Sequence, residues 1–214
     1  IVGPTGAGKS TTMDIIMGLI SPTEGRITVD DICIAPSNQR AWQSQIGYVP
    51  QTIHLVDDTI AHNIAFGFRD GGVDMERVRS VARLAHIADF IERELAEGYD
   101  TVVGEQGVRL SGGQRQRIAI ARALYRKPAV LVFDEGMSSL DAATEADISM
   151  ALRNLAHETT LIVVTHRLNM AEGCKHIVLL DDGGVADRGE YRELMGRSSL
   201  FRDMASPAKR RRTA

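Results

Sequence analysis

A run of residues near the start of the chain has the types and spacing of a phosphate-binding loop (P-loop). The pattern G-x-x-x-x-G-K-[ST] is matched by Gly3-Pro4-Thr5-Gly6-Ala7-Gly8-Lys9-Ser10, and Thr11 follows where an amphipathic helix is expected to begin. Glycines at these positions let backbone N–H groups turn inward around the β- and γ-phosphates of a nucleotide. We expect Lys9 to supply a cation to the phosphate oxygens and Ser10 to place its hydroxyl on Mg²⁺. The N-terminus of the helix adds a favourable dipole.

Two adjacent carboxylates end an apolar segment in the second half of the chain. The run is Leu131-Val132-Phe133-Asp134-Glu135, and its apolar part is expected to be a buried strand. In open α/β sheets the carboxyl ends of the strands face the ligand crevice, so both carboxylates should lie there. We expect Asp134 to hold Mg²⁺ through water. Glu135 is placed to polarise an attacking water, as a general base or by orienting it.

A third run places small residues at the expected start of another helix. Leu110-Ser111-Gly112-Gly113-Gln114 precedes an amphipathic segment that should be helical from Gly112 to Tyr125. A helix N-terminus of this kind can bind phosphate. Its simplest alternative role is to cap the helix. Within a single domain we expect this run to lie too far from the P-loop to touch the same nucleotide.

These three motifs, in this order, make the chain resemble the ATP-binding domain of ABC transporters over nearly its whole length. In that family two such domains close face to face around ATP. The resemblance therefore implies that the signature turn, residues 111–114, caps the γ-phosphate held by a partner domain. A second domain of the same family, identical or different, is thus an expected partner.

Three further residues occupy positions that matter in this family. Gln51, after Tyr48-Val49-Pro50, resembles the glutamine whose amide oxygen reaches Mg²⁺ and whose loop faces the membrane domain. His166, after an apolar segment, resembles the histidine that contacts the γ-phosphate. Asp141 resembles the aspartate that crosses the dimer interface, and it also suits the N-cap of the following helix.

The resemblance thus implies a complete set of site residues with ATP and Mg²⁺ as ligands. The catalytic residues would be Glu135, His166 and Lys9, and the residues near the metal ion would be Ser10, Gln51 and Asp134. The nucleotide-binding residues would be Gly3, Pro4, Thr5, Gly6, Ala7, Gly8, Lys9, Ser10, Thr11, Gln51, Ser111, Gly112, Gly113, Gln114 and Asp141.

Apolar patterns predict a helix from Lys9 to Ile20 and strands at Ile46–Val49 and Thr160–Val164. Alternation of strand and helix patterns predicts the fold class, an α/β protein with a mostly parallel sheet flanked by helices. The resemblance specifies a P-loop NTPase (RecA-like) core with an inserted α-helical subdomain. We assign residues 1–55 and 118–200 to the discontinuous core and residues 56–117, which include the signature turn, to the helical subdomain. Residues 201–214 are expected to be a basic, flexible tail.

Composition and charge set broad limits on the function. The chain has 214 residues, of which 43% are hydrophobic, and a formal net charge of −3. This charge argues against a general binder of polyanions, so we expect no nucleic acid partner. No stretch approaches the roughly 18 uninterrupted apolar residues of a membrane-spanning helix. Ile1-Val2 has the pattern of the end of a buried strand. We therefore expect the chain to be a fragment from which an upstream region is missing.

The segment from Asp100 to Gly107 favours the exporter branch of the family, in which a similar segment lies beside the membrane part. We therefore expect an ATPase domain that powers export through a transmembrane domain absent from this chain. The expected location is the cytoplasmic face of a membrane, the bacterial inner membrane above all. The alternative is a soluble, non-transporting ABC ATPase. A DNA-maintenance protein would separate the P-loop from the signature turn by a long coiled coil. A ribosome-associated factor would carry two such domains and a charged linker.

Overall fold

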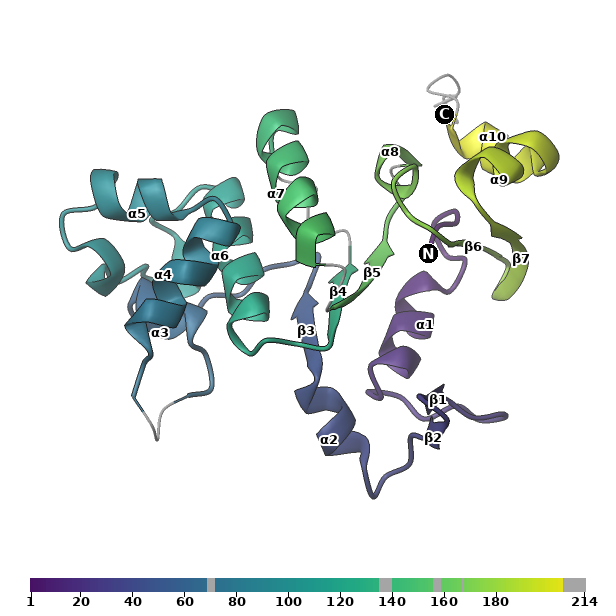
Figure 1. The fold of residues 1–214 in the computed structure, drawn as a ribbon, viewed down its shortest axis with the longest axis horizontal. Helices are drawn as coiled ribbons and strands as arrows, with labels where there is room; N and C mark the ends of the chain where they lie inside the picture. Colours follow the sequence, from purple (N-terminus) through teal and green to yellow (C-terminus); the bar gives the residue numbers. More distant parts are fainter. Residues whose placement is uncertain (69–71, 135–139, 156–158, 167, 206–214) are drawn as a thin grey trace. The chain divides into compact units, whose positions relative to one another are not determined.

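The structure is a computed structural model that describes residues 1–68, 72–134, 140–155, 159–166 and 168–205. Packing divides the chain into two compact units (Figure 1). The first unit comprises Ile1–Pro36 with Val163–Ala214, and the second comprises Ser37–Ile162. The chain therefore enters the second unit once and returns within a strand, β5 (Thr160–Val164).

In the first unit, the two residues before the P-loop are paired on both sides. Ile1 exchanges backbone hydrogen bonds of 2.7 and 3.1 Å with residues at the end of β5. Val2 does the same with β6 (Ile177–Asp181), at 2.9 and 2.8 Å, and the two segments run parallel. The P-loop therefore begins at the end of a strand segment with a neighbour on each side, as the sequence predicted.

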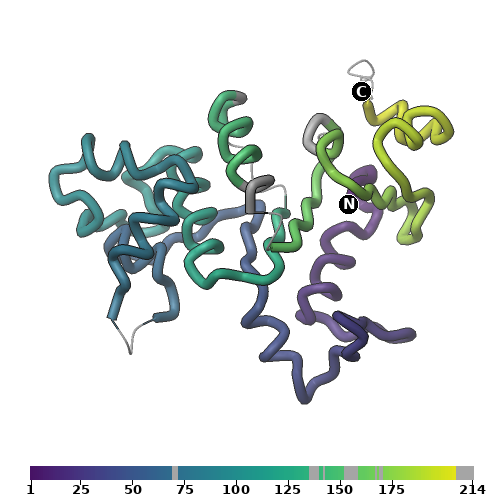
Figure 2. Tube along the Cα trace, in the orientation of Figure 1, coloured from purple at the N-terminus to yellow at the C-terminus, as the bar shows by residue number. Residues whose placement is uncertain are grey.

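The remainder of the first unit covers this strand segment with apolar side chains. β6 pairs antiparallel with β7 (Gly184–Gly189). In the chain, α8 (Leu168–Ala171) precedes β6, and α9 (Tyr191–Arg197) and α10 (Ser199–Ala205) follow β7. The chain trace shows α9 beside this hairpin and α10 packed on α9 (Figure 2). Their core consists of Val2, Leu168, Ala171, Ile177, Leu179, Leu194 and Phe201.

Residues 201–205, which the prediction included in the tail, are helical in the structure. Residues 199–205 form α10, and Phe201 is fully buried and stacks edge-on against Tyr191 at 5.4 Å between ring centroids. The physical reason is the burial of a large aromatic ring, which outweighs the basic composition of the residues that follow. The basic run at residues 209–212 lies outside the described residues.

The helix after the P-loop, α1 (Lys9–Ile16), is shorter than the predicted Lys9–Ile20. It ends in a Schellman motif, in which Gly18 N donates to Ile15 O at 2.9 Å and Leu19 N donates to Asp14 O at 2.7 Å. Gly18 has a φ of 68°, a left-handed conformation that glycine adopts at no steric cost. The helix is followed by a small antiparallel pair, β1 (Thr28–Val29) and β2 (Ile32–Cys33).

The second unit contains a sheet in the order β3-β4-β5. β3 (Ile46–Val49) follows α2 (Gln39–Ser44) and pairs in parallel with β4 (Val130–Asp134), so that Val49 lies opposite Phe133. β4 is buried along its apolar length, and α7 (Ala142–Leu155) connects it to β5. The parallel pairing and the strand–helix alternation confirm the predicted α/β class.

A group of helices completes the second unit, on the left of Figure 1. It consists of α3 (Ile60–Ile64), α4 (Met75–Leu84), α5 (Ala88–Glu94) and α6 (Gly112–Tyr125), with short 3₁₀ turns at Gly98–Asp100 and Glu105–Gly107. α3 and α4 both pack on α6. The core side chains here are Ile60, Ile64, Val78, Val81, Ile87, Ile91, Ile118 and Ile120.

The bounds of these elements agree closely with the sequence prediction in three places. β3, α6 and β5 begin and end at the predicted residues. The two packing units do not coincide with the predicted core, residues 1–55 and 118–200, and helical subdomain, residues 56–117. That division follows the motifs and stays a prediction.

Candidate nucleotide-binding site

The P-loop in the first unit has a backbone that side chains would obstruct. A Cβ at Gly3 would collide with the carbonyl oxygen of Leu180. Gly6 and Gly8 have φ values of 84° and 89°, which a residue with a side chain rarely adopts. The glycines of the motif are therefore required by the path of the chain itself.

Lys9 folds back over the start of this loop. Its ammonium donates hydrogen bonds to the carbonyl oxygens of Gly3, at 2.9 Å, and Pro4, at 2.8 Å. Ala7 N donates to Pro4 O at 3.2 Å and closes a turn inside the loop. The positive charge is thus held at the loop that the sequence assigned to phosphate.

The first turn of α1 offers backbone amides at the same place. The N-cap residue is Gly8, which provides no side-chain acceptor, and the first N–H groups of a helix lack intrahelical partners. Ser10 and Thr11, in this turn, are exposed. A glycine loop, an ammonium and a helix N-terminus fit a phosphate chain, and the exposed Ser10 hydroxyl fits the role of a ligand to Mg²⁺.

His166 belongs to the same unit and to the same end of its strands. Thr165 N donates to Ile1 O at 3.1 Å, so His166 is one residue beyond this hydrogen bond and Gly3 is two residues beyond Ile1. The imidazole of His166 is exposed. The first unit therefore places the P-loop and His166 at the carboxyl ends of neighbouring strand segments.

Gln51 and Asp134 share an edge of the sheet in the second unit. Because Val49 and Phe133 are opposite each other in a parallel pair, the chain leaves both strands at the same end. Asp134 is half-buried, and its Oδ2 accepts a hydrogen bond from Tyr48 Oη at 3.5 Å. Gln51 is exposed. An amide and a carboxylate at one edge suit a magnesium ion that keeps several waters and its substrate oxygens.

The signature turn forms the N-terminus of α6. Ser111 is the N-cap, and its Oγ accepts from Gln114 N at 3.2 Å while Gln114 Oε1 accepts from Ser111 N at 2.7 Å. These reciprocal hydrogen bonds make a capping box. Gly112 and Gly113 occupy the first turn of the helix, and Arg115 Nη1 donates to Leu110 O at 2.6 Å, which fixes the approach to it.

Asp141 caps the helix α7, in agreement with the second role that the sequence offered for it. Its two carboxylate oxygens accept from Thr144 N at 3.0 Å and from Thr144 Oγ1 at 2.7 Å. These hydrogen bonds hold the pKa of the Asp141 carboxyl below its usual value. Glu135, the predicted general base, lies outside the described residues.

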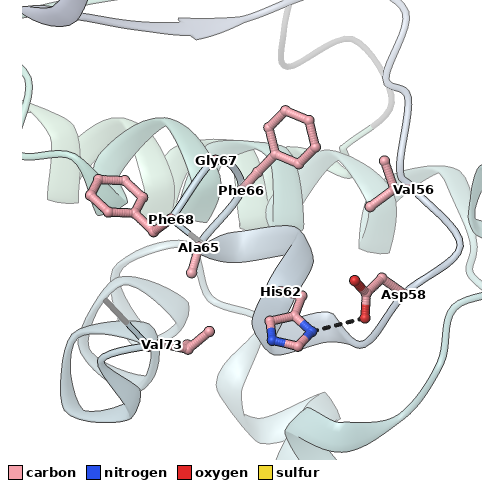
Figure 3. A pocket seen from close by; sticks show the side chains of 9 residues that line it. Val56, Asp58, His62, Ala65, Phe66, Gly67, Phe68 and Val73 are labelled. Atoms are coloured by element: carbon pink, nitrogen blue, oxygen red, sulfur yellow. Dashed lines mark hydrogen bonds and ion pairs between the residues drawn. The ribbon is translucent and has the colours of Figure 1, made fainter. Parts of the chain in front are cut away.

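Beside α3 lies a hollow that the sequence patterns do not predict (Figure 3). Its volume is about 210 Å³. Phe66 and Phe68 stand on its rim with 49% and 41% of their surface exposed, and Asp58 Oδ1 lies within hydrogen-bonding distance, 2.9 Å, of His62 Nδ1 on another side. The sequence signal that could have indicated this hollow is the run Phe66-Gly67-Phe68, which follows the buried helix α3. The residues that line the hollow are Val56, Asp58, His62, Ala65, Phe66, Gly67, Phe68, Gly72 and Val73.

The fold and the P-loop define this chain as a P-loop NTPase. The sequence profile of the family described as "ABC transporter" matches residues 1–138. The chain therefore belongs to the ABC transporter family, and it corresponds to the family's ATPase domain. Membership in this family implies nucleotide binding.

Two relatives and one solved structure show which branch the chain resembles. It is 46% identical to an ATM1-type heavy metal exporter of Novosphingobium aromaticivorans, and the similarity covers 95% of this chain and 33% of the relative. It is 40% identical to an ATP-dependent lipid A-core flippase of Ralstonia nicotianae, over 94% of this chain and 34% of the relative. A bacterial Atm1-family ABC exporter solved with ATP bound superposes with a TM-score of 0.89 and 44% identity, over 95% of this chain and 35% of that one.

The chain thus spans about a third of the length of these relatives. In the part of the chain that the structure describes, no helix has the length and apolar character needed to cross a membrane.

Proposed function

We propose that this chain is the motor domain of an exporter, in which ATP hydrolysis between two such domains drives transport through a membrane domain. The observation that carries the proposal is the combination, in one chain, of a P-loop, a strand that ends at Asp134 with Glu135 next in the sequence, and a capped signature turn. The exporter relatives favour this function over a soluble, non-transporting ATPase.

In the proposed mechanism, each residue acts on the phosphate chain or on the attacking water. The amides of the P-loop and the ammonium of Lys9 bind and orient the β- and γ-phosphates. Glu135 orients the attacking water and accepts its proton, and His166 contacts the γ-phosphate. The signature turn and Asp141 of a second domain complete the site from the opposite side.

Mg²⁺, when bound, would neutralise charge on the phosphate oxygens. Ser10, Gln51 and Asp134 are the proposed residues around it, with Asp134 acting through water. Oxygen ligands of this kind, few in number, suit a small ion that retains part of its water shell.

The partner on the membrane side is proposed to meet the segment that follows Gln51. That segment leads to the hollow, which is lined by the exposed rings of Phe66 and Phe68 together with the hydrogen-bonded side chains of Asp58 and His62. Exposed aromatic side chains around a concavity are typical of a surface that a partner covers. As part of this proposal, which the exporter relatives support, the domain lies at the cytoplasmic face of a membrane, and in a bacterial cell at the inner membrane.

The first test is the rate of Mg-ATP hydrolysis by this chain as a function of its concentration, with Glu135→Gln as the inactive variant. Glu94→Gln, which also removes a carboxylate but on the exposed face of α5, is the matched control. We expect the rate per molecule to rise with concentration in the wild type and in the control, and to vanish in the Glu135→Gln variant.

Two results would contradict the proposal in different ways. A zero rate at every concentration would exclude a motor formed by two copies of this chain. A rate independent of concentration, yet abolished by Glu135→Gln, would leave the hydrolysis and exclude the two-domain site. For the transport step, membrane spans encoded next to this domain support the exporter, whereas a second ATPase domain with a charged linker supports a soluble factor.

A further inference from the structure

Arg122, in the helix that follows the signature turn (the signature helix, α6), forms hydrogen bonds to several parts of the segment 54–66. The Arg122 guanidinium donates from Nε to Asn63 O at 2.7 Å, from Nη2 to Asn63 Oδ1 at 2.8 Å and from Nη1 to His54 O at 2.9 Å. Burial lowers the pKa of Arg122 to about 10, so the group keeps its charge at neutral pH. A half-buried charge with three acceptors, all from one segment, is a strong tie between that segment and α6.

Asn63 connects Arg122 to the turn that precedes α3 through further hydrogen bonds. It is fully buried, and its Nδ2 donates to Val56 O and to Thr59 O, each at 3.0 Å. Its Oδ1 also accepts from Val56 N at 3.0 Å. Because the amide of Asn63 holds both ends of this turn, a shift of Arg122 would displace the backbone at residues 56–59.

The same guanidinium lies over the ring of Phe66, with its Cζ 5.1 Å from the ring centroid. Phe66 is half exposed on the rim of the hollow, and Val56 lines another side (Figure 3). Arg122 therefore contacts the wall of the hollow as well as the segment that precedes it, and a cation–π contact of this kind fixes the ring.

We propose that Arg122 is a positioning residue, which sets the orientation of α6 and thereby the position of the signature turn relative to the segment 54–66. The proposal rests on the function proposed above. α6 is one uninterrupted helix, and Ser111 is about 16 Å from Arg122 along it at the usual rise per residue. Because the helix is stiff over this length, a rotation at Arg122 also rotates its N-terminus. Binding of a partner at the hollow would therefore change the position of Ser111, Gly112 and Gly113.

Arg77 offers a matched control, because it makes a similar tie to the same helix in a different direction. It lies on α4 and donates from Nε to Tyr125 O at 3.1 Å and from Nη2 to Leu124 O at 2.8 Å. Replacing it removes charge-assisted hydrogen bonds from α6 but leaves the contacts between Arg122 and the segment 54–66. A merely structural role for Arg122 predicts equal consequences for Arg122→Gln and Arg77→Gln.

The experiment compares these two variants in the 214-residue chain at a temperature well below their melting temperatures. We expect Arg122→Gln to lower the maximal rate of ATP hydrolysis by about tenfold, because small misplacements of an active-site group have effects of this size. The Kd for ATP, measured at concentrations where the chains do not associate, should stay within about twofold of the wild type, since the P-loop is in the other unit. Arg77→Gln should keep the wild-type rate.

Two further variants keep the test informative if Arg122→Gln folds poorly. Arg122→Lys retains the charge but lacks the planar fork, so its rate should lie between those of the wild type and the glutamine variant. Phe66→Leu changes only an exposed ring, and it should lower the rate in the same direction by a smaller factor. Equal losses in Arg122→Gln and Arg77→Gln, or a wild-type rate in Arg122→Gln and Phe66→Leu, would overturn the proposal.

Amide hydrogen exchange separates this proposal from the proposed function, because it requires no turnover. Arg122→Gln should accelerate exchange at Gln114 and Arg115, whose N–H groups donate to Ser111 in the first turn of α6, whereas Arg77→Gln should accelerate it only near residues 122–125. Protection unchanged at Gln114 and Arg115 in Arg122→Gln would contradict the positioning role, whatever the wild-type ATPase rate. A wild-type chain without turnover but with the expected exchange would contradict only the proposed function.

Discussion

Two helices begin at proposed phosphate sites, yet their N-termini are built in opposite ways. α1 begins after Gly8, whose φ is 89° and which has no side chain to cap the first turn. α6 begins after Ser111, an extended residue whose hydroxyl joins Gln114 in a capping box. The amides of α1 are therefore left for a ligand, whereas part of the first turn of α6 is already satisfied by its own side chains.

This difference indicates an order of binding. The P-loop can take a phosphate chain without giving up a side-chain cap, and Lys9 already lies against the loop. At the signature turn a phosphate must exchange with, or add to, the hydrogen bonds between Ser111 and Gln114. We therefore expect the P-loop to bind nucleotide first and the signature turn to be the weaker, second contact, supplied by another domain.

The largest expected effect comes from Lys9→Ala, which tests the first half of the comparison. Without the ammonium we expect ATP hydrolysis to fall by about 1000-fold, and ATP binding to weaken, because the developing phosphate charge loses its nearest cation. Lys175→Ala, which removes an exposed lysine of the same unit, serves as the control and should keep wild-type values. Tight ATP binding by Lys9→Ala, measured by calorimetry, would contradict the role of the P-loop.

A second variant, Ser111→Asp, separates capping from phosphate binding at α6. Aspartate caps a helix as well as serine does, so the melting temperature should not change. Its negative charge should repel the partner's phosphate and lower hydrolysis by about 100-fold, while ATP binding by the P-loop stays normal. A wild-type rate in this variant would show that the signature turn does not approach the nucleotide.

Ser111→Ala should give the complementary pattern. It removes the acceptor for Gln114 N, and we expect the free energy of unfolding to fall by about 1 kcal/mol. Chemical denaturation with urea would measure this loss. An unchanged midpoint would mean that the capping box contributes nothing to stability, and the contrast between α6 and α1 would then be one of geometry alone.

The smallest expected effect is that of Gln114→Glu. Glutamate keeps the capping box and adds a negative charge at the positive end of the helix dipole, so stability should rise by about 0.3 kcal/mol. The same urea titration, with Ser111→Ala as reference, would detect it. A fall in stability would indicate that the environment of the turn is already too negative for a further charge.

Local patterns were sufficient to predict most elements and the placement of the motifs. β3 and α6 were found at their observed bounds because their apolar periodicity and caps are encoded in neighbouring residues. The end of α1 was predicted too late, since Gly18 acts through a left-handed backbone and not through hydrophobic pattern. α10 was missed because Phe201 is buried by residues distant in the chain.

The network around Arg122 could not be read from the sequence for the same reason. Its partners Asn63 and His54 are 59 and 68 residues away in the sequence. No sequence pattern indicates which main-chain carbonyl a given arginine will bind. The P-loop was different, because the conformations of Gly3 and Gly8 are demanded by a short run whose spacing carries its own chemistry. Chemistry held within a few residues is predictable, whereas chemistry assembled from residues far apart in the chain is not.

The pairing of Ile1 and Val2 with β5 and β6 has a consequence for how the chain is made. The second unit is continuous, from Ser37 to Ile162, and can fold while the ribosome is still working. The strand segment that supports the P-loop must wait for residues 163–180 before it has a neighbour on either side. These are contacts of very high sequence separation, which form slowly. A nascent chain that stops before β6 should therefore bind no nucleotide, although its signature helix is already folded.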